Sequence, residues 1–285
     1  MLIFGIPALV ALALLIVVVL NDRRGRRRLR REVPALLADT PRDLPPFRHD
    51  DLAGLPEPVA RCLRRNRKDG QALFRCVRYR QRGSIRLWHS RLWVDFTAQG
   101  YLRADRPAYL WVARLRPKIG ALAFLWVDVR ERWADAQGSR VIKALTTLRI
   151  TDADGPEIAA ATLSRYLAEL ITLPTALLPG AALRWAAIDA DSARAVFHSG
   201  DQMVQADFTF NALGDITRVV VAQRPRAVRG GYVAERWTLT CAEHRLFDGY
   251  YAPTQITASW AGRGGEVTYF RAAFHAIETD LPAAF

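Results

Sequence analysis

The chain has few cysteines for its 285 residues. Cys62, Cys76 and Cys241 are odd in number, and no two of them form a C-x-x-C pair. We therefore expect neither a disulfide framework nor a zinc site. Free thiols persist in a reducing compartment, which agrees with a location in the cytoplasm.

The sequence also lacks the short motifs that mark common active sites. No Walker loop, G-x-S-x-G, H-E-x-x-H or G-x-G-x-x-G is present. The histidines never pair at the spacing of metal ligands, and residues 152–155 (DADG) lack the third ligand and the closing glutamate of a calcium loop. On a strand, Cys241 and His244 would point to opposite faces, so they form no thiol–imidazole pair. The sequence therefore predicts no catalytic residue, no metal and no cofactor, and a hydrolase with an unrecognised site is kept as an alternative.

Lysine is scarce as well, with only Lys68, Lys118 and Lys143. Nearly all of the basic charge, in a chain of formal net charge +13, is therefore arginine. A basic surface of this kind can bind phosphate groups. Here the arginines are spread over the chain rather than gathered in one patch, so we do not expect a nucleic-acid partner.

What the chain does contain is a long apolar run at its start, Met1–Leu20. As a helix this run spans roughly 28 Å, close to the thickness of the hydrocarbon core of a bilayer. A cleavable signal peptide needs a basic segment before the apolar run and a small-residue cleavage site after it. The run has neither, so residues 1–20 are predicted to form a transmembrane anchor.

A run of arginines follows the apolar segment directly. The seven residues are Arg23, Arg24, Arg26, Arg27, Arg28, Arg30 and Arg31. Basic flanks tend to stay in the cytoplasm, which predicts a single-pass protein of the inner membrane with its body on the cytoplasmic side. These arginines could contact anionic lipid head groups at about 1 kcal/mol per residue, and the alternative is a stop-transfer flank without a specific lipid site.

The rest of the chain divides into two parts. Residues 21–54 combine the basic flank with a Pro-rich linker, and residues 55–285 form one β-rich domain. Patterns of period two run from Leu73 to Arg149 and again from Arg184 to Ile277.

One helical pattern separates the two runs of strands. Thr162–Leu178 has apolar residues at helical spacing, and Pro174 should kink or end that helix. Gly83-Ser84 suggests a hairpin turn. The predicted fold class is α+β and mainly antiparallel β, with a curved sheet or half-barrel that wraps one central helix and follows the N-terminal transmembrane helix.

Four strings of the body resemble a bacterial family known only as a domain of unknown function, number 6544. They are LPEPVARCL, GSIRLWHSRLWVDFTAQGYLRADRPAYLWVARLR, LSRYLAELITLPTALLPGAALRW and GYYAPTQITASW, and the resemblance covers about Leu55 to Ile277. Most members read Glu-x-x-Trp-x-Pro in the helix, where this chain has Thr172 in place of the tryptophan. The family pattern is similar to lipoprotein-carrier half-barrels, which hold acyl chains under a curved sheet, and this likeness implies a fold rather than a function.

The central helix carries the candidate site. Arg165 and Glu169 lie four residues apart, which suits either an exposed ion pair or a pair that faces the sheet and recognises a polar head group. The tryptophans either pack the core or line a cavity for an apolar ligand. The predicted ligand-binding residues are Trp111, Arg165, Tyr166, Glu169, Leu170, Trp185, Arg224 and Trp237.

These observations predict a membrane-anchored, non-catalytic protein that binds a lipid or another amphipathic ligand. The alternative is a ligand-free structural or interaction protein at the membrane. A solid core in place of a cavity would favour that alternative.

Overall fold

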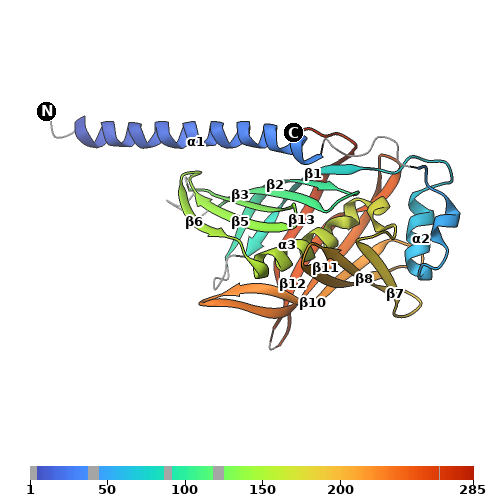
Figure 1. The fold of residues 1–285 in the computed structure, drawn as a ribbon. Coiled ribbons are helices and arrows are strands. Elements are labelled where there is room, and N and C mark those ends of the chain that lie inside the picture. The colour runs from blue at the N-terminus through green and yellow to red at the C-terminus, as the bar shows by residue number, and fades with distance from the viewer. Residues whose placement is uncertain (1–4, 38–44, 87–91, 118–124, 263) are drawn as a thin grey trace.

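The computed structural model describes residues 5–37, 45–86, 92–117, 125–262 and 264–285. A single antiparallel sheet of thirteen strands dominates the fold, in the order β6-β5-β4-β3-β2-β1-β13-β12-β11-β10-β9-β8-β7 (Figure 1). The strands are β1 (Cys76–Arg86), β2 (Trp93–Arg103), β3 (Ala108–Arg116), β4 (Val127–Ala134), β5 (Gln137–Ala144), β6 (Leu148–Ala153), β7 (Leu183–Ala187), β8 (Ser192–Ser199), β9 (Gln202–Phe210), β10 (Ile216–Val228), β11 (Gly231–Phe247), β12 (Tyr250–Gly262) and β13 (Gly265–Thr279).

Two meanders of sequential strands make up this sheet. The last strand, β13, pairs with the first, β1, with Tyr79 opposite Ile277. This pairing joins the meander β1–β6 to the meander β7–β13. The prediction of a mainly antiparallel half-barrel around one central helix is confirmed, because the sheet curves around α3 (Figure 1).

The central helix α3 spans Pro156–Glu169. Gly155 precedes it with φ 96°, a conformation that suits glycine, and Pro156 takes the first helical position, where its missing N–H is not needed. The helix therefore begins before the predicted start at Thr162. It gives way to two short 3-10 helices, η3 (Leu170–Thr172) and η4 (Pro174–Leu177), so the expected interruption near Pro174 is present.

The predicted hairpin at Gly83-Ser84 is wrong, because β1 runs straight through these residues. Gly83 lies opposite Ala272 of β13 in the sheet. A Cβ atom there would overlap the carbonyl oxygen of Arg271. The glycine thus marks a close approach of the neighbouring backbone rather than a turn.

The N-terminal helix α1 spans Gly5–Leu37 and continues into the segment that the sequence suggested as a linker. Its last turns lie on the outer face of the sheet, where Val33 and Leu37 pack in a cluster with Tyr101 and Leu110. This apolar contact explains why the helix continues through Pro34. Residues 38–44 of the suggested linker lie outside the described residues.

Two further short helices, η1 (His49–Leu52) and α2 (Glu57–Asn66), precede the sheet. Val59 and Leu63 of α2 are fully buried in the main core with α3 and the sheet. No helix within the described ranges has the length and apolar character needed to cross a membrane, so the predicted transmembrane helix is not supported. Met1–Phe4 of the predicted span lie outside those ranges.

Candidate functional site

A group of charged side chains is buried on the concave side of the sheet, beneath α3. Nη1 of Arg165 on α3 lies 3.1 Å from Oε2 of Glu131 on β4. Nε of Arg165 lies 3.2 Å from Oε1 of Glu169, one helical turn further along. The Arg165 and Glu169 side chains are 14% and 5% exposed, so the pair faces the sheet and is not an exposed surface pair.

Glu131 lies at the centre of this group. Arg140, opposite Glu131 on β5, places Nη2 3.1 Å from Oε1 of Glu131, and Nη2 of Arg224 on β10 lies 4.0 Å from the same oxygen. Burial alone would raise the pKa of Glu131, but the neighbouring guanidinium groups outweigh burial and lower that pKa to about 2. Glu131 is therefore ionised at neutral pH. The guanidinium cluster is the name used below for Arg140, Arg165, Arg224, Glu131 and Glu169.

The second acid of the cluster, Glu169, has a different environment. The hydroxyl of Tyr79 on β1 donates a hydrogen bond to Oε2 of Glu169 at 2.9 Å. Burial raises the pKa of Glu169, although Arg165 and this hydrogen bond act in the opposite direction. Three arginines thus face two glutamates, one of which takes up a proton more readily than usual. The cluster holds an excess of positive charge inside the protein.

Two tryptophans cover the arginines of the cluster. The ring of Trp111 lies 4.2 Å from the guanidinium carbon of Arg165, and the ring of Trp237 lies 4.5 Å from that of Arg224. These distances are those of cation–π contacts. Trp111 also donates its indole N–H to Oε1 of Gln81 at 3.0 Å. Nε2 of Gln81 is buried without a hydrogen-bond partner among the described residues, so it is an unused donor close to the arginines.

The structure brings five of the predicted ligand-binding residues together: Trp111, Arg165, Glu169, Arg224 and Trp237. Tyr166 and Leu170 lie in the main core and are almost fully buried. The hydroxyl of Tyr166 donates to the carbonyl of Arg103 at 2.8 Å. Trp185 lies apart from the cluster on β7, where its ring meets Phe208 and its indole N–H donates to a backbone carbonyl.

Sequence reasoning missed Glu131, Arg140, Tyr79 and Gln81. A signal for Glu131 was present in the alternation of β4, because Glu131 shares the phase of Val129 and Trp133 rather than that of the solvent-facing side chains. An acidic residue whose side chain points to the same face as the apolar residues of its strand is expected to be buried and paired with a basic side chain. The register that places Arg140 opposite it follows from the tight turn between β4 and β5.

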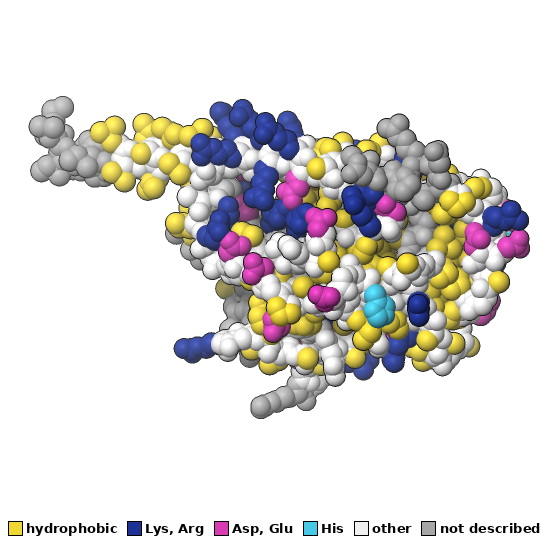
Figure 2. Space-filling model, viewed as in Figure 1, with side chains coloured by type: hydrophobic (Ala, Val, Ile, Leu, Met, Phe, Trp, Pro, Cys, Tyr) yellow, Lys and Arg dark blue, Asp and Glu magenta, His cyan; other side chains and the backbone are white. Residues whose placement is uncertain are grey.

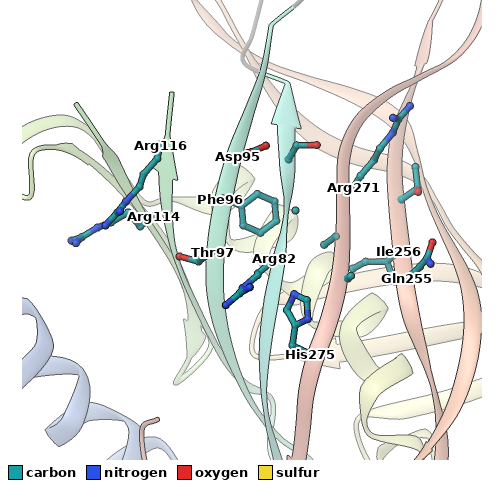
Figure 3. Close-up of a pocket in the computed structure, with 15 residues that line it drawn as sticks. Arg82, Asp95, Phe96, Thr97, Arg114, Arg116, Gln255, Ile256, Arg271 and His275 are labelled. Atoms are coloured by element: carbon teal, nitrogen blue, oxygen red, sulfur yellow. The ribbon is translucent and has the colours of Figure 1, made fainter. Parts of the chain in front are cut away.

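A shallow groove of about 860 Å³ lies on the opposite, outer face of the sheet (Figure 3). Its basic side chains include Arg82, Arg114, Arg116 and Arg271, which come from β1, β3 and β13. Arg114 is ion-paired to both Asp128 and Asp22 of α1, at 2.7 Å in each case. The sheet therefore separates two basic sites, the buried cluster and this open groove.

The arginines predicted to flank a membrane anchor are all exposed on α1. They form a dense basic surface along that helix (Figure 2). Asp22 pairs with Arg26 of this surface and with Arg114 of the sheet, and Glu32 pairs with Arg28 of the surface and with Arg130 and Arg132 of the sheet, so the other five arginines have no acid of α1, within its described residues, as an ion-pair partner. The basic surface is thus open to solvent.

Metal-ligating and redox residues form no site within the part of the chain that the structure describes. No group of three or more His, Cys, Asp or Glu side chains there could hold a metal ion. Cys62, Cys76 and Cys241 are free and buried. Burial raises the pKa of the Cys76 thiol to about 11, so this thiol stays protonated at neutral pH.

The fold and the site define a half-barrel that encloses a charged cluster beneath a central helix. The chain belongs to the family of unknown function DUF6544, whose model matches residues 45–272. No curated protein matches the chain.

Several solved structures are similar to the chain at low identity. A putative outer membrane lipoprotein-sorting protein domain from Vibrio parahaemolyticus has 11% identity and a TM-score of 0.38, over 79% of this chain and 92% of that chain. A LolA superfamily protein from Nitrosomonas europaea has 13% identity and a TM-score of 0.38, over 81% and 96%. A DUF1329 family protein from Desulfovibrio piger has 9% identity and a TM-score of 0.43, over 80% and 94%. Similarity at this level does not say what the chain binds.

Proposed function

We propose that this protein is a membrane-attached, non-catalytic binding protein for an amphipathic ligand with an anionic group. The observation that carries the proposal is the excess of buried guanidinium groups beneath α3. A buried charge without a full counter-charge is destabilising, and an anionic ligand group would complete the cluster. Arg165 and Arg224 would bind that group, and the unused amide of Gln81 would donate to it.

The apolar part of such a ligand would lie between α3 and the sheet. Trp111, Trp237 and Leu170 offer apolar surface there, beside the arginines. Tyr166 and Leu170 are packed in the core, so α3 would have to move away from the sheet to admit the ligand. The rival function, a ligand-free interaction protein, leaves α3 in place at all times.

Native mass spectrometry of the full chain, purified from membranes in mild detergent, tests this function. We expect a co-purified anionic amphiphile on the wild-type protein and its loss in Arg224→Gln, because a neutral side chain cannot bind the anion. Gln81→Glu should also lose the ligand, since it adds an anion beside the cluster. Arg194→Gln is the matched control, because Arg194 forms an exposed pair with Asp207 on the same sheet.

Either of two results would contradict the proposal. If folded wild-type protein carries no amphiphile, or if Arg224→Gln and Gln81→Glu both keep it, the cluster is not a ligand site. Circular dichroism on each variant shows that the sheet is retained. A ligand-free wild-type protein would favour the interaction-protein alternative.

Attachment to the inner membrane through α1, with the body in the cytoplasm, is the second part of the proposal. The apolar side chains of α1 that support it are exposed in the structure, among them Leu9, Leu14 and Leu15. The exposed arginines that follow them favour the cytoplasmic side.

Reporter fusions at the C-terminus test the orientation. A fusion to alkaline phosphatase should be inactive and a fusion to a fluorescent protein should be bright, because the phosphatase folds only outside the reducing cytoplasm. An active phosphatase with a dark fluorescent protein would place the body on the other side of the membrane.

A further inference from the structure

Several turns of the two meanders lie at the same end of the strands, which forms one edge of the sheet. In an antiparallel meander, every second turn lies at the same edge. The register places Arg86 opposite Trp93, Ala144 opposite Leu148, and Val228 opposite Gly231. The ends of β3 and β12 and the starts of β4 and β13 lie at this edge too. The proximal edge is the name used below for these strand ends.

The apolar part of α1 leaves the body at the proximal edge. Thr146, in the turn between β5 and β6, donates its hydroxyl to the carbonyl of Val18 at 3.3 Å. Nδ2 of Asn21 donates to Oγ1 of Thr147 in the same turn at 3.1 Å. The helix before Val18 extends past the sheet, on the side toward which β6 and the β10–β11 hairpin also point (Figure 1).

Exposed apolar side chains gather at the same edge. Outside α1, the described large apolar residues that are well exposed number twelve, and seven of them lie at the proximal edge. The seven are Leu92, Leu125, Leu148, Ile150, Tyr232, Val233 and Val267. Leu148 and Ile150 are the most exposed of these, at 65% and 60%. Of the remaining five, Met203 follows the β8–β9 turn, where Gly200 lies close to Ala136 of the β4–β5 turn, and the other four, Ile188, Leu213, Leu246 and Leu281, lie at the opposite ends of the strands.

Aromatic and basic side chains accompany them. Trp93, Trp126 and Trp260 lie half-buried at these strand ends. Arg116 and Arg229 are exposed there and have no carboxylate partner among the described residues. Among the nearby acids, Asp95 lies opposite Arg116 in the sheet, and Asp128 and Glu266 are ion-paired to Arg114 and Arg218. Leucine, tryptophan and unpaired arginine together are typical of the interface between a membrane and water.

We propose that the proximal edge rests in the head-group region of an anionic lipid bilayer. The inference depends on the proposed attachment through α1 and goes beyond it, because it fixes which surface of the domain meets the lipid. Apolar side chains on several separate turns suit a deformable lipid surface, and the unpaired arginines complement anionic head groups. The half-barrel would thus stand with its strand ends on the membrane.

Site-specific fluorescence in reconstituted vesicles tests this placement. The full chain carries an environment-sensitive dye at Leu148→Cys, or at Leu246→Cys as the matched control. Leu246 is similarly exposed, at 61%, but ends β11 at the opposite edge. The native cysteines are buried and remain unlabelled under native conditions. The vesicles contain phosphatidylcholine and phosphatidylglycerol, with or without a spin-labelled lipid that quenches dyes near the head groups.

We expect the dye at position 148 to shift its emission to the blue and to lose intensity with the spin-labelled lipid. The dye at position 246 should keep its aqueous emission and respond to iodide in the buffer.

If the protein floats with the vesicles while both dyes stay aqueous, attachment through α1 stands and the placement of the edge is wrong. If the dye at 148 is shielded from lipid and iodide alike, a second copy of the chain covers the edge, which also overturns the inference. If the full chain does not float at all, the attachment itself is wrong, and the inference fails with it.

Discussion

Replacement of Glu131 by alanine is expected to lower the free energy of unfolding by about 3–5 kcal/mol, the range for removing one partner of a buried ion pair. The change leaves Arg140, Arg165 and Arg224 buried with Glu169 as the one remaining acid of the cluster. Urea denaturation of the variant and the wild type measures the difference.

Asp207→Ala is the matched control, because Asp207 forms a half-exposed pair with Arg194 on the same sheet. Pairs of this kind contribute about 0–1 kcal/mol, so the control should remain close to the wild type. A loss below about 1 kcal/mol in Glu131→Ala would show that the cluster is well solvated rather than a buried charge network.

The stability of the wild-type protein at low pH should depend on the same interaction of Glu131 with the arginines. The pKa of Glu131 is lowered from 4.5 to about 2 in the folded state, so its contribution to stability is present above pH 4.5 and is lost as the pH falls toward 2. Glu169 acts in the opposite sense, because burial raises its pKa and its protonated form is favoured by folding. Only the Glu131 contribution should be missing from the acid unfolding curve of the alanine variant.

The sheet and the central helix could be predicted from the sequence, because the spacing of apolar residues along a strand or a helix is a local property of the chain. Alternation predicted nearly all the strands, and the apolar stripe around Leu163 and Leu167 predicted α3. The extension of α1 to Leu37 could not be predicted in this way. It depends on contacts with Tyr101 and Leu110, which are distant in sequence.

The guanidinium cluster was predictable only in part. Arg165 and Glu169 share a helix, so their proximity followed from helical spacing. Arg224 reaches the interior because a register shift between Val221 and Arg224 changes the side-chain phase of β10. No local pattern shows such a shift. The pairing of Glu131 with Arg165 likewise depends on how the whole sheet curves around α3.

The proposed attachment to the membrane through α1 predicts the largest effect of all. The double variant Leu12→Arg with Ile16→Arg places two charges on the exposed apolar part of α1, where these leucine and isoleucine side chains are 53% and 49% exposed. One arginine at the centre of a membrane helix costs about 2.5–3.5 kcal/mol, so two should weaken insertion by about 5–7 kcal/mol. This loss lowers the membrane-bound fraction more than about a thousandfold relative to the free fraction.

Fractionation of cells and a carbonate wash of the membranes measure this shift. The wild-type chain should stay with the washed membranes and the double variant should be released. The double variant Leu213→Arg with Leu246→Arg is the control, since it adds the same charge at exposed positions away from α1, and it should stay in the membrane fraction. Release of the wild type, or retention of the α1 variant, would show that the apolar part of α1 is not what holds the protein at the membrane. Release of the α1 variant is expected because only the basic surface of α1 and the proximal edge would still contact the membrane, and such contacts with anionic head groups weaken when charge is screened.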